Sequence, residues 1–326
     1  MQKLTQVAKP QEILAPAKVN LGLRVVGRRA DGYHDLSSAF SFVDWYDSLT
    51  FHPKPLTAEA SDIATSNESI NTSAISVRMH GPSAPTELRA EDNLVVKAYC
   101  WAQGQFGDLP TVHIDVQKNI PHGAGLGGGS SDAAAVLRWA ANQCGVGPDT
   151  LTEQQITLMS QQLGADVYPL FHGTSRMWNG TGDVPGPALA QTALSNLFGQ
   201  HVLIAYPGVA VSTKQVFTAL SPQDFLPNPQ EKAAVPIGIA AGDNESNKLF
   251  NSLERAACEL APKIGDVLTA LKQLEPSFYG MSGSGAACFA IFNTARGWPS
   301  DQAAPMRWLA DYCTLHQGKL KTDAWA

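Results

Sequence analysis

The chain of 326 residues lacks a long hydrophobic run, an excess of basic residues and closely paired cysteines. No stretch approaches the roughly 18 consecutive apolar residues that a membrane-spanning helix needs, and the amino terminus shows no apolar leader segment. The net charge of −6 argues against a nucleic-acid-binding groove, which needs a basic surface. We therefore expect a cytoplasmic protein that acts on a small molecule and has no nucleic-acid, membrane or obligate protein partner.

The five cysteines do not form the pairs that a disulfide framework or a zinc site requires. Their number is odd, and no two of them form a C-x-x-C pair. We expect them to be buried thiols. They are Cys100, Cys144, Cys258, Cys288 and Cys313.

The first element predicted from the sequence is a β-hairpin. Between residues 13 and 25 apolar and polar residues alternate, which indicates a half-buried strand with Lys18 and Asn20 on the same side. The Asp31-Gly32 pair is typical of a hairpin turn, and a second strand is expected between residues 38 and 51. Residues 52–74 are poor in apolar side chains, so we interpret them as a surface insertion.

Helices and strands follow one another along the rest of the chain. Helices are expected over residues 93–106, 152–163 and, as a pair, 246–274; strands are expected over residues 112–116, 201–206 and 286–292. One further helix begins near residue 130, with Ser130 or Ser131 as its N-cap, and Gly164 ends the helix 152–163. A segment rich in Gly and Pro near residue 190 separates a predicted N-terminal domain, residues 1–190, from a C-terminal domain, residues 191–326.

Glycine is concentrated in one short segment. Five of the 28 glycines lie between Gly123 and Gly129, after a predicted strand and before a predicted helix. The free N–H groups and the positive dipole end of a helix N-terminus favour an anion such as phosphate. A tight turn would need only one glycine. We therefore predict a phosphate-binding loop, with a plain strand-to-helix turn as the alternative.

Several known loop types do not fit this segment. It has no lysine, whereas a Walker A loop contains one. Residues 123–128 match G-x-G-x-x-G, but Asn142 and Gln143 stand about 20 residues later, where a dinucleotide-binding fold needs an acidic residue. The segment 280–285 fails the G-x-S-x-G pattern of serine hydrolases because Ser284 replaces the last glycine. A nicotinamide-dependent oxidoreductase stays an open alternative.

Three motifs taken together resemble the GHMP kinase superfamily: residues 16–21 (PAKVNL), 123–131 (GAGLGGGSS) and 283–287 (GSGAA). Within it, residues 30–34 (ADGYH), 91–94 (EDNL), 125–132 (GLGGGSSD) and 163–167 (LGADV) are similar to the 4-diphosphocytidyl-2-C-methyl-D-erythritol kinase family. The resemblance implies an α+β fold of the GHMP kinase type, with two domains and the active site in the cleft between them. Tyr168 departs from the family pattern, in which proline commonly follows Gly-Ala-Asp-Val.

The resemblance also implies a reaction and its cofactors. ATP would phosphorylate the C2 hydroxyl of 4-diphosphocytidyl-2-C-methyl-D-erythritol, giving the 2-phosphate and ADP, in non-mevalonate isoprenoid biosynthesis. Mg²⁺ is expected, and its protein ligands are not assigned: Ser130 or Ser131 could contact it, and Asp132 could either bind it or compensate the helix dipole. Another GHMP kinase, of the homoserine or mevalonate type, and a nucleotide-binding module without turnover are alternatives.

Residue roles follow from the same resemblance. Asp166 is the expected general base, and Lys18 is the expected cation that keeps this carboxylate ionised. Without the resemblance, Asp166 could cap the following segment and Lys18 could lie on a solvated strand face. The expected ATP-binding residues are Asn93, Lys118, Pro121, His122, Gly123, Ala124, Gly125, Leu126, Gly127, Gly128, Gly129, Ser130, Ser131, Gly283, Ser284 and Gly285. The expected substrate-binding residues are Asn20, Tyr33, His34, Thr213 and Phe217.

Overall fold

The computed structural model describes residues 9–53, 70–72, 74–189, 195–225 and 247–325. The contacts of these residues form two compact units: unit 1 comprises the described residues within 9–15, 46–122 and 128–172, and unit 2 those within 16–45, 123–127 and 173–325. This grouping differs from a single division near residue 190, because the first two strands and the glycine-rich segment each contribute to both units. The predicted insertion 52–74 lies mostly outside the described residues.

A long β-hairpin opens the chain, as the sequence predicts. Strand β1 (Gln11–Arg28) pairs with strand β2 (His34–Pro53), and the turn between them closes with an Arg29 N–H donating to the Tyr33 carbonyl at 2.8 Å. Gly32 has a φ of 87°, which glycine adopts without strain. The prediction of a half-buried β1 is wrong, since residues 15–23 are all buried, the polar Lys18 and Asn20 included.

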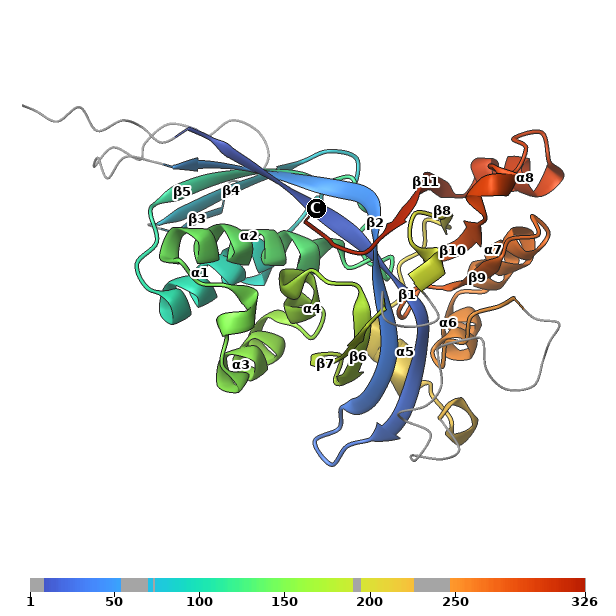
Figure 1. The fold of residues 1–326 in the computed structure, drawn as a ribbon, viewed down its shortest axis with the longest axis horizontal. Helices are drawn as coiled ribbons and strands as arrows, with labels where there is room; N and C mark the ends of the chain where they lie inside the picture. Colours follow the sequence, from blue (N-terminus) through green and yellow to red (C-terminus); the bar gives the residue numbers. More distant parts are fainter. Residues whose placement is uncertain (1–8, 54–69, 73, 190–194, 226–246, 326) are drawn as a thin grey trace, which may run out of the picture. The chain divides into compact units, whose positions relative to one another are not determined.

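Unit 1 is a small sheet covered on one face by helices (Figure 1). Its strands follow the order β3 (Ile70–Thr72), β4 (Ile75–His80), β5 (Val112–Gln117) and the end of β2, with β4 and β5 parallel. Helices α1 (Leu94–Phe106) and α2 (Gly128–Cys144) pack against each other. Phe51 of β2 stacks on Trp139 of α2 with ring centroids 5.0 Å apart, so aromatic rings join the sheet to this helix.

Several of the expected site residues of unit 1 lie at the ends of its helices. The Asn93 side chain caps α1 by accepting the Val95 N–H at 2.9 Å. Helix α3 (Glu153–Leu163) ends before Gly164, whose φ is 113°, and helix α4 (Val167–His172) begins three residues later. The predictions for α1 and α3 are therefore confirmed. The N-cap prediction for α2 is wrong, because this helix already begins at Gly128 and holds Ser130 and Ser131 in its first turn.

Unit 2 is built on an antiparallel sheet. Strand β8 (His201–Tyr206) pairs with β10 (Cys288–Phe292) and β11 (Thr314–Lys321), and β10 also pairs with β9 (Phe278–Met281). Strand β2 pairs with β11 and also with β6 (Arg176–Gly180). Strand β6 pairs in turn with β7 (Val184–Ala188). The helices are α5 (Thr213–Thr218), α6 (Glu254–Leu260), α7 (Lys263–Lys272) and α8 (Ala304–Tyr312).

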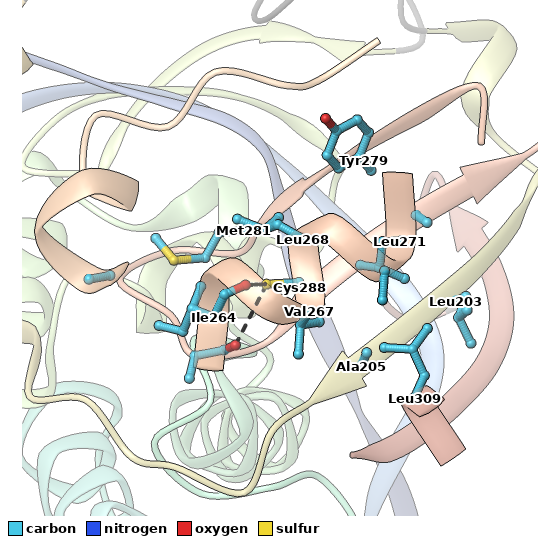
Figure 2. Close-up of a cluster of buried hydrophobic side chains, with 14 of the residues drawn as sticks. Leu203, Ala205, Ile264, Val267, Leu268, Leu271, Tyr279, Met281, Cys288 and Leu309 are labelled. Carbon is cyan, nitrogen blue, oxygen red and sulfur yellow. Dashed lines mark hydrogen bonds between the residues drawn. The ribbon is translucent and has the colours of Figure 1, made fainter. Parts of the chain in front are cut away.

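The core of unit 2 lies between α7 and the sheet (Figure 2). Ile264, Val267 and Leu271 of α7 are fully buried against strand residues. The Cys288 thiol donates weakly to the carbonyls of Ile264 and Ala286, at 4.0 and 3.8 Å. Burial raises the pKa of this thiol. The prediction of buried thiols holds for Cys288 and is wrong for the other four cysteines, of which Cys100 is exposed and the rest are half-buried.

Across the described segments, no helix is both long and apolar enough to cross a membrane.

Candidate functional site

The polar pair of β1 is held by a chain of hydrogen bonds inside unit 2. The Lys18 ammonium donates to Asn20 Oδ1 at 2.7 Å, and Asn20 Nδ2 donates to Ser38 Oγ at 2.7 Å. Ser38 Oγ then donates to the Gly22 carbonyl at 3.0 Å. These bonds explain how two polar side chains can be buried on this strand. They also confirm that Lys18 and Asn20 lie on the same side of β1.

The first part of the glycine-rich loop belongs to the same unit. The Lys18 N–H donates to the Leu126 carbonyl, and the Ala287 N–H donates to the Ala124 carbonyl, each at 2.9 Å. Gly125 has a φ of 77°, and a Cβ added to it would lie 2.3 Å from the Ser282 carbonyl oxygen. Glycine is therefore required at residue 125, both for its conformation and for this close approach.

Gly283 marks the point where the three family motifs meet. A Cβ added to this residue would lie 3.3 Å from Asn20 Oδ1, 3.3 Å from the Gly125 carbonyl and 3.4 Å from the Lys18 ammonium. Strand β1, the glycine-rich loop and the segment 280–285 are thus in direct contact. The predicted site residues of unit 2 that come together here are Lys18, Asn20, Ala124, Gly125, Leu126 and Gly283.

The second part of the loop forms the first turn of α2 in unit 1. Gly128, Gly129 and Ser130 are partly exposed, whereas Pro121 and Ser131 are buried. The first N–H groups of a helix have no partner within it, and α2 is 17 residues long. This turn therefore has the donors and the dipole that favour a phosphate group.

Behind this turn, Lys118 forms ion pairs with two buried aspartates. Its ammonium donates to Asp47 Oδ2 and to Asp132 Oδ2, the latter at 2.5 Å. Asp47 Oδ1 also accepts the N–H groups of Asn119 and Ile120, at 2.6 and 2.9 Å. We call Asp47, Lys118 and Asp132 the buried charge cluster. Its ammonium is occupied by carboxylates, so a contact between Lys118 and ATP stays a prediction.

The buried charge cluster holds one more acidic group than it has cations. Burial, assisted by the Asp47 carboxylate, raises the pKa of Asp132 to about 7, although Lys118 opposes the shift. Burial would lower the pKa of Lys118, but the charges and hydrogen bonds of Asp132 and Asp47 outweigh burial and raise it. Lys118 is therefore charged at neutral pH, and the pKa of the Asp132 carboxyl lies well above that of an exposed aspartate.

Asp166 lies at the start of α4 in unit 1. It directly precedes Val167, and its carbonyl accepts the Leu170 N–H at 3.2 Å, as an N-cap residue does. Its side chain is half-buried. At the other end of α4, the guanidinium of Arg138 on α2 donates to the Phe171 and His172 carbonyls, each at 3.0 Å. Helix α4 is therefore fixed to α2, the helix that begins in the glycine-rich loop.

Two of the expected substrate-binding residues, His34 and Phe217, form an aromatic pair. His34 stacks on Phe217, with centroids 5.0 Å apart and an interplanar angle of 25°, and Phe225 approaches the same imidazole at 5.9 Å. Tyr33 is 65% exposed in the hairpin turn. Burial and the Arg28 charge lower the pKa of His34, so its imidazole is neutral at pH 7. The observed aromatic pair is therefore His34 and Phe217, and substrate binding by Tyr33 stays a prediction.

A hydroxyl pair links a predicted substrate residue with a predicted nucleotide residue. Thr213 Oγ1 and Ser284 Oγ share a hydrogen bond of 2.8 Å. Thr213 is the first residue of α5, whose N-cap Ser212 accepts the Gln215 N–H. Phe217 lies one turn further along α5 and is partly buried against the core of unit 2. Phe217 therefore packs against the core and is still partly exposed, so substrate binding by its ring stays a prediction.

An ion pair fixes the segment that carries Phe225. The Asp224 carboxylate accepts from Arg255 Nε at 2.9 Å and Nη2 at 2.6 Å, and also from the Ser221 N–H at 2.7 Å. The hydrogen bonds from Arg255 hold the pKa of Asp224 down at about 2, against the opposing effect of burial. Asp224 is only 7% exposed, so this ion pair is screened less than one at the surface.

We expect Asp224→Asn to lower the free energy of unfolding by about 2 kcal/mol at pH 7, since each pKa unit corresponds to about 1.4 kcal/mol. The folded pKa is about 2 and the unfolded one about 3.8. The stabilisation is therefore fully present above pH 4 and lost as the pH falls toward 2. Urea unfolding of both proteins between pH 7 and pH 3 measures the difference, which should narrow below pH 4.

Glu259→Gln is the matched control for this prediction, because Glu259 accepts from the same Arg255 at 2.6 Å. Its side chain is 60% exposed, so the substitution should change stability by less than about 0.5 kcal/mol. A loss in Asp224→Asn that is constant from pH 7 to pH 3 would contradict the role assigned to this ion pair.

Sequence reasoning missed several buried polar residues. Asp47, Ser282 and Asn251 have no place in the motifs on which the resemblance rests, and the sequence suggests for Asp132 only a metal ligand or a helix-dipole partner. The signal that could have pointed to Ser282 is its place within the glycine-rich segment 280–285. Within the described residues, no group of three or more His, Cys, Asp or Glu side chains is arranged to hold a metal ion.

Comparison with known proteins identifies the family. Residues 93–174 match the model for the GHMP kinases N terminal domain, and residues 230–304 match that for GHMP kinases C terminal. Curated relatives that bear the name 4-diphosphocytidyl-2-C-methyl-D-erythritol kinase include the following two. The one from Parvibaculum lavamentivorans is 34% identical, over 85% of this chain and 87% of its own length. The one from Bradyrhizobium sp. (strain ORS 278) is 36% identical, over 85% and 86%.

Solved structures agree with the sequence comparison. A crystal structure of 4-(cytidine 5'-diphospho)-2C-methyl-D-erythritol kinase matches with a TM-score of 0.66 and 29% identity, over 95% of this chain and 99% of that one. Homoserine kinase from Cytophaga hutchinsonii matches with a TM-score of 0.58 over 99% of both chains, but at 18% identity it shows the fold alone. The α+β architecture of the GHMP kinases is thereby confirmed. The chain belongs to the 4-diphosphocytidyl-2-C-methyl-D-erythritol kinase family of the GHMP kinases, and it is an ATP-dependent small-molecule kinase.

Proposed function

We propose that this kinase transfers the γ-phosphoryl group of ATP to the C2 hydroxyl of 4-diphosphocytidyl-2-C-methyl-D-erythritol. The new bond joins the C2 oxygen to phosphorus, the bond between the γ-phosphorus and the bridging oxygen breaks, and the products are the 2-phosphate and ADP. The reaction would serve non-mevalonate isoprenoid biosynthesis in the cytoplasm.

The observation that carries this proposal is the identity of 34–36% to relatives bearing this name, over 85% of the chain. The structure adds that Lys18, Gly125 and Gly283, one from each family motif, are in contact within unit 2. The likeness to homoserine and mevalonate kinases extends only to the fold, at 18% and 10% identity. These findings favour the proposed kinase over those two and over an oxidoreductase.

Asp166 is the proposed acceptor of the hydroxyl proton. An alcohol is a weak acid, so its attack on phosphorus is assisted by a base that takes the proton as the new bond forms. Lys18 is the proposed cation that stabilises negative charge on the reacting oxygens. Its hydrogen bond to Asn20 and its place over the Phe40 ring, with the ammonium 5.0 Å from the centroid, fix where that charge lies in unit 2.

ATP is proposed to bind through the first turn of α2 and the loop before it. The unpaired N–H groups of residues 128–131 would donate to phosphate oxygens. Asn93 and Lys118 are proposed to lie near the adenine and the phosphates, as in the family.

Mg²⁺ is the proposed second cofactor, and it would neutralise charge on the β- and γ-phosphates. It commonly takes most of its ligands from water and phosphate oxygens, so few protein groups are needed. The Ser131 hydroxyl fits such a role, because it is buried in the first turn of α2 and has no hydrogen-bond partner among the described residues.

The cytidine moiety is proposed to bind beside α5. Phe217 offers a ring face, and the neutral imidazole of His34 offers one donor and one acceptor for a base edge. In the structure these two rings stack on each other, so a pyrimidine that stacks on Phe217 would take the place of the His34 ring. Tyr33, Thr213 and Asn20 are proposed further substrate contacts.

We expect the purified protein to convert ATP to ADP, in the presence of Mg²⁺, when the diphosphocytidyl substrate is added. A coupled ADP-release assay measures this rate, and product analysis locates the phosphate on C2. Mevalonate and homoserine should give kcat/KM values lower by at least about 100-fold, because a site built to hydrogen-bond a substrate group rejects compounds that lack it. CMP should compete with the diphosphocytidyl substrate.

The same assay on Asp166→Asn, purified in parallel, controls for contaminating kinases. Faster turnover of mevalonate or homoserine than of the diphosphocytidyl substrate would overturn the assignment of the substrate. Binding of ATP without turnover of any of the three alcohols would favour a nucleotide-binding module. NAD binding without ATP binding would favour the oxidoreductase.

A further inference from the structure

Ser282 is a fully buried residue whose hydroxyl joins two of the family motifs. It accepts the Asn20 N–H at 3.3 Å and donates to the Gly125 carbonyl at 2.9 Å. Asn20 is the residue of β1 whose side chain holds the Lys18 ammonium. One hydroxyl therefore connects the strand that carries Lys18 with the glycine-rich loop.

The backbone around Ser282 is fixed from several sides. The Ser282 N–H donates to the Ala287 carbonyl at 2.9 Å, and the Ser282 carbonyl accepts the Gly285 N–H at 3.0 Å. The buried Asn251 amide donates to the carbonyls of both neighbours, Met281 and Gly283, each at 2.9 Å. The direction of the Ser282 side chain is thus set by the fold, and its hydroxyl is a fixed reference for the groups that it contacts.

Loss of this hydroxyl would act on both of its partners. The Asn20 N–H would be left buried without an acceptor, and the Gly125 carbonyl would lose a donor. Both residues lie near the Lys18 ammonium. Asn20 accepts its hydrogen bond, and the Gly125 carbonyl and the ammonium both lie close to Gly283. A small movement of either would displace the ammonium from the loop.

We propose that Ser282 is a positioning residue for phosphoryl transfer, because its hydroxyl sets the place of Lys18 relative to the Gly125 backbone. This proposal rests on the proposed function, in which Lys18 stabilises charge on the reacting oxygens. Ser282 acts through Lys18 and does not itself touch ATP or the alcohol.

The first test compares Ser282→Ala with Ser252→Ala. Ser252 is also a buried serine of unit 2, and its hydroxyl accepts the Val25 N–H of β1 at 3.0 Å without contact to the glycine-rich loop. Both substitutions should lower the melting temperature by similar amounts. Ser282→Ala should lower kcat by about 10-fold or more, the scale expected for a misplaced reacting group, with little change in the KM of the diphosphocytidyl substrate. Ser252→Ala should keep kcat within about twofold of the wild type.

The second test asks whether Ser282 acts through Lys18. The kcat of Lys18→Met should be the same with and without Ser282→Ala, because the effects of substitutions in groups that act as a unit do not add. A merely structural role would give the same fold loss in both backgrounds. Ser282→Cys, which restores a weak donor and acceptor, should recover part of the lost kcat.

Three results would overturn the proposal: a kcat of Ser282→Ala within about twofold of the wild type, an equal loss in Ser252→Ala, or additive losses with Lys18→Met. Failure of the proposed function is recognised separately, since the wild type would then not phosphorylate the diphosphocytidyl substrate. In that case the same variants are compared by their slow hydrolysis of ATP with water as acceptor, and the same three results apply.

Discussion

Replacement of Asp166 by asparagine is expected to lower kcat by at least about 100-fold, the usual scale for loss of a general base. Asparagine has the shape of aspartate and is equally good as an N-cap, but it cannot take up the proton of the attacking hydroxyl. The start of α4, which Asp166 precedes, should therefore keep its structure. The coupled ADP-release assay gives kcat, and urea unfolding should show a change in stability within about 0.5 kcal/mol.

Two further variants separate this role from the alternatives. Asp149→Asn removes an acidic group of unit 1 whose side chain is 88% exposed, so it changes the net charge equally and should keep kcat within about twofold. Asp166→Ala removes both the base and any cap, and it should add a loss of stability of about 1 kcal/mol to the loss of kcat. If Asp166→Asn were as active as the wild type, another group would have to accept the proton.

Elements with a strong local pattern could be predicted from the sequence. Helices α1 and α3 and strands β5 and β8 lie within one residue of their predicted bounds. In each, the apolar period and an end signal, such as Thr152 before α3 or Gly107 after α1, agree. The predicted helix near residue 130 is too short, because glycines are typical of loops, whereas Gly128 and Gly129 are the first two residues of α2.

Burial of polar residues could not be predicted, because it depends on partners far away in the chain. The alternation in β1 predicts a half-buried strand with Lys18 and Asn20 on the same side, but both residues are buried, and Ser38 and Ser282 form hydrogen bonds with Asn20 inside the protein. Ser282 is 262 residues away from it. A period-two pattern reports which side chains share a face and says nothing of what covers that face.

The aromatic residues of the proposed substrate site show the same limit. The family resemblance named Tyr33, His34 and Phe217, and the structure stacks the last two. Phe225 lies beside His34, and the neighbouring Asp224 is held by Arg255, which is 31 residues further along the chain. A motif identifies residues that bind a ligand, whereas the residues that place them come from the fold.

Replacement of Lys118 by methionine is expected to lower the free energy of unfolding by about 3–5 kcal/mol, the usual cost of removing one partner from a buried ion pair. Methionine fills a similar volume but leaves the carboxylates of Asp47 and Asp132 buried together without a cation. Lys118 is 71 residues from Asp47 in the chain, so their ion pair forms only when the protein is folded. The loss of stability should therefore appear in the free energy of global unfolding. Urea unfolding at pH 7 measures it, and ATP titration of the folded variant gives the nucleotide affinity.

Asp132→Asn tests the cause of this loss, because it removes charge from the same cluster while Asp47 still compensates Lys118. It should cost about 1 kcal/mol or less, since the amide oxygen can still accept from the ammonium. The double variant Lys118→Met/Asp132→Asn should be more stable than Lys118→Met alone, because only Asp47 is then uncompensated, and its Oδ1 keeps two N–H donors. A phosphate-binding lysine would behave in the opposite way: Lys118→Met would weaken ATP binding at little cost in stability, and Asp132→Asn would not rescue it. The order of stability among the three variants therefore decides whether Lys118 stabilises the buried charge cluster or contacts the nucleotide.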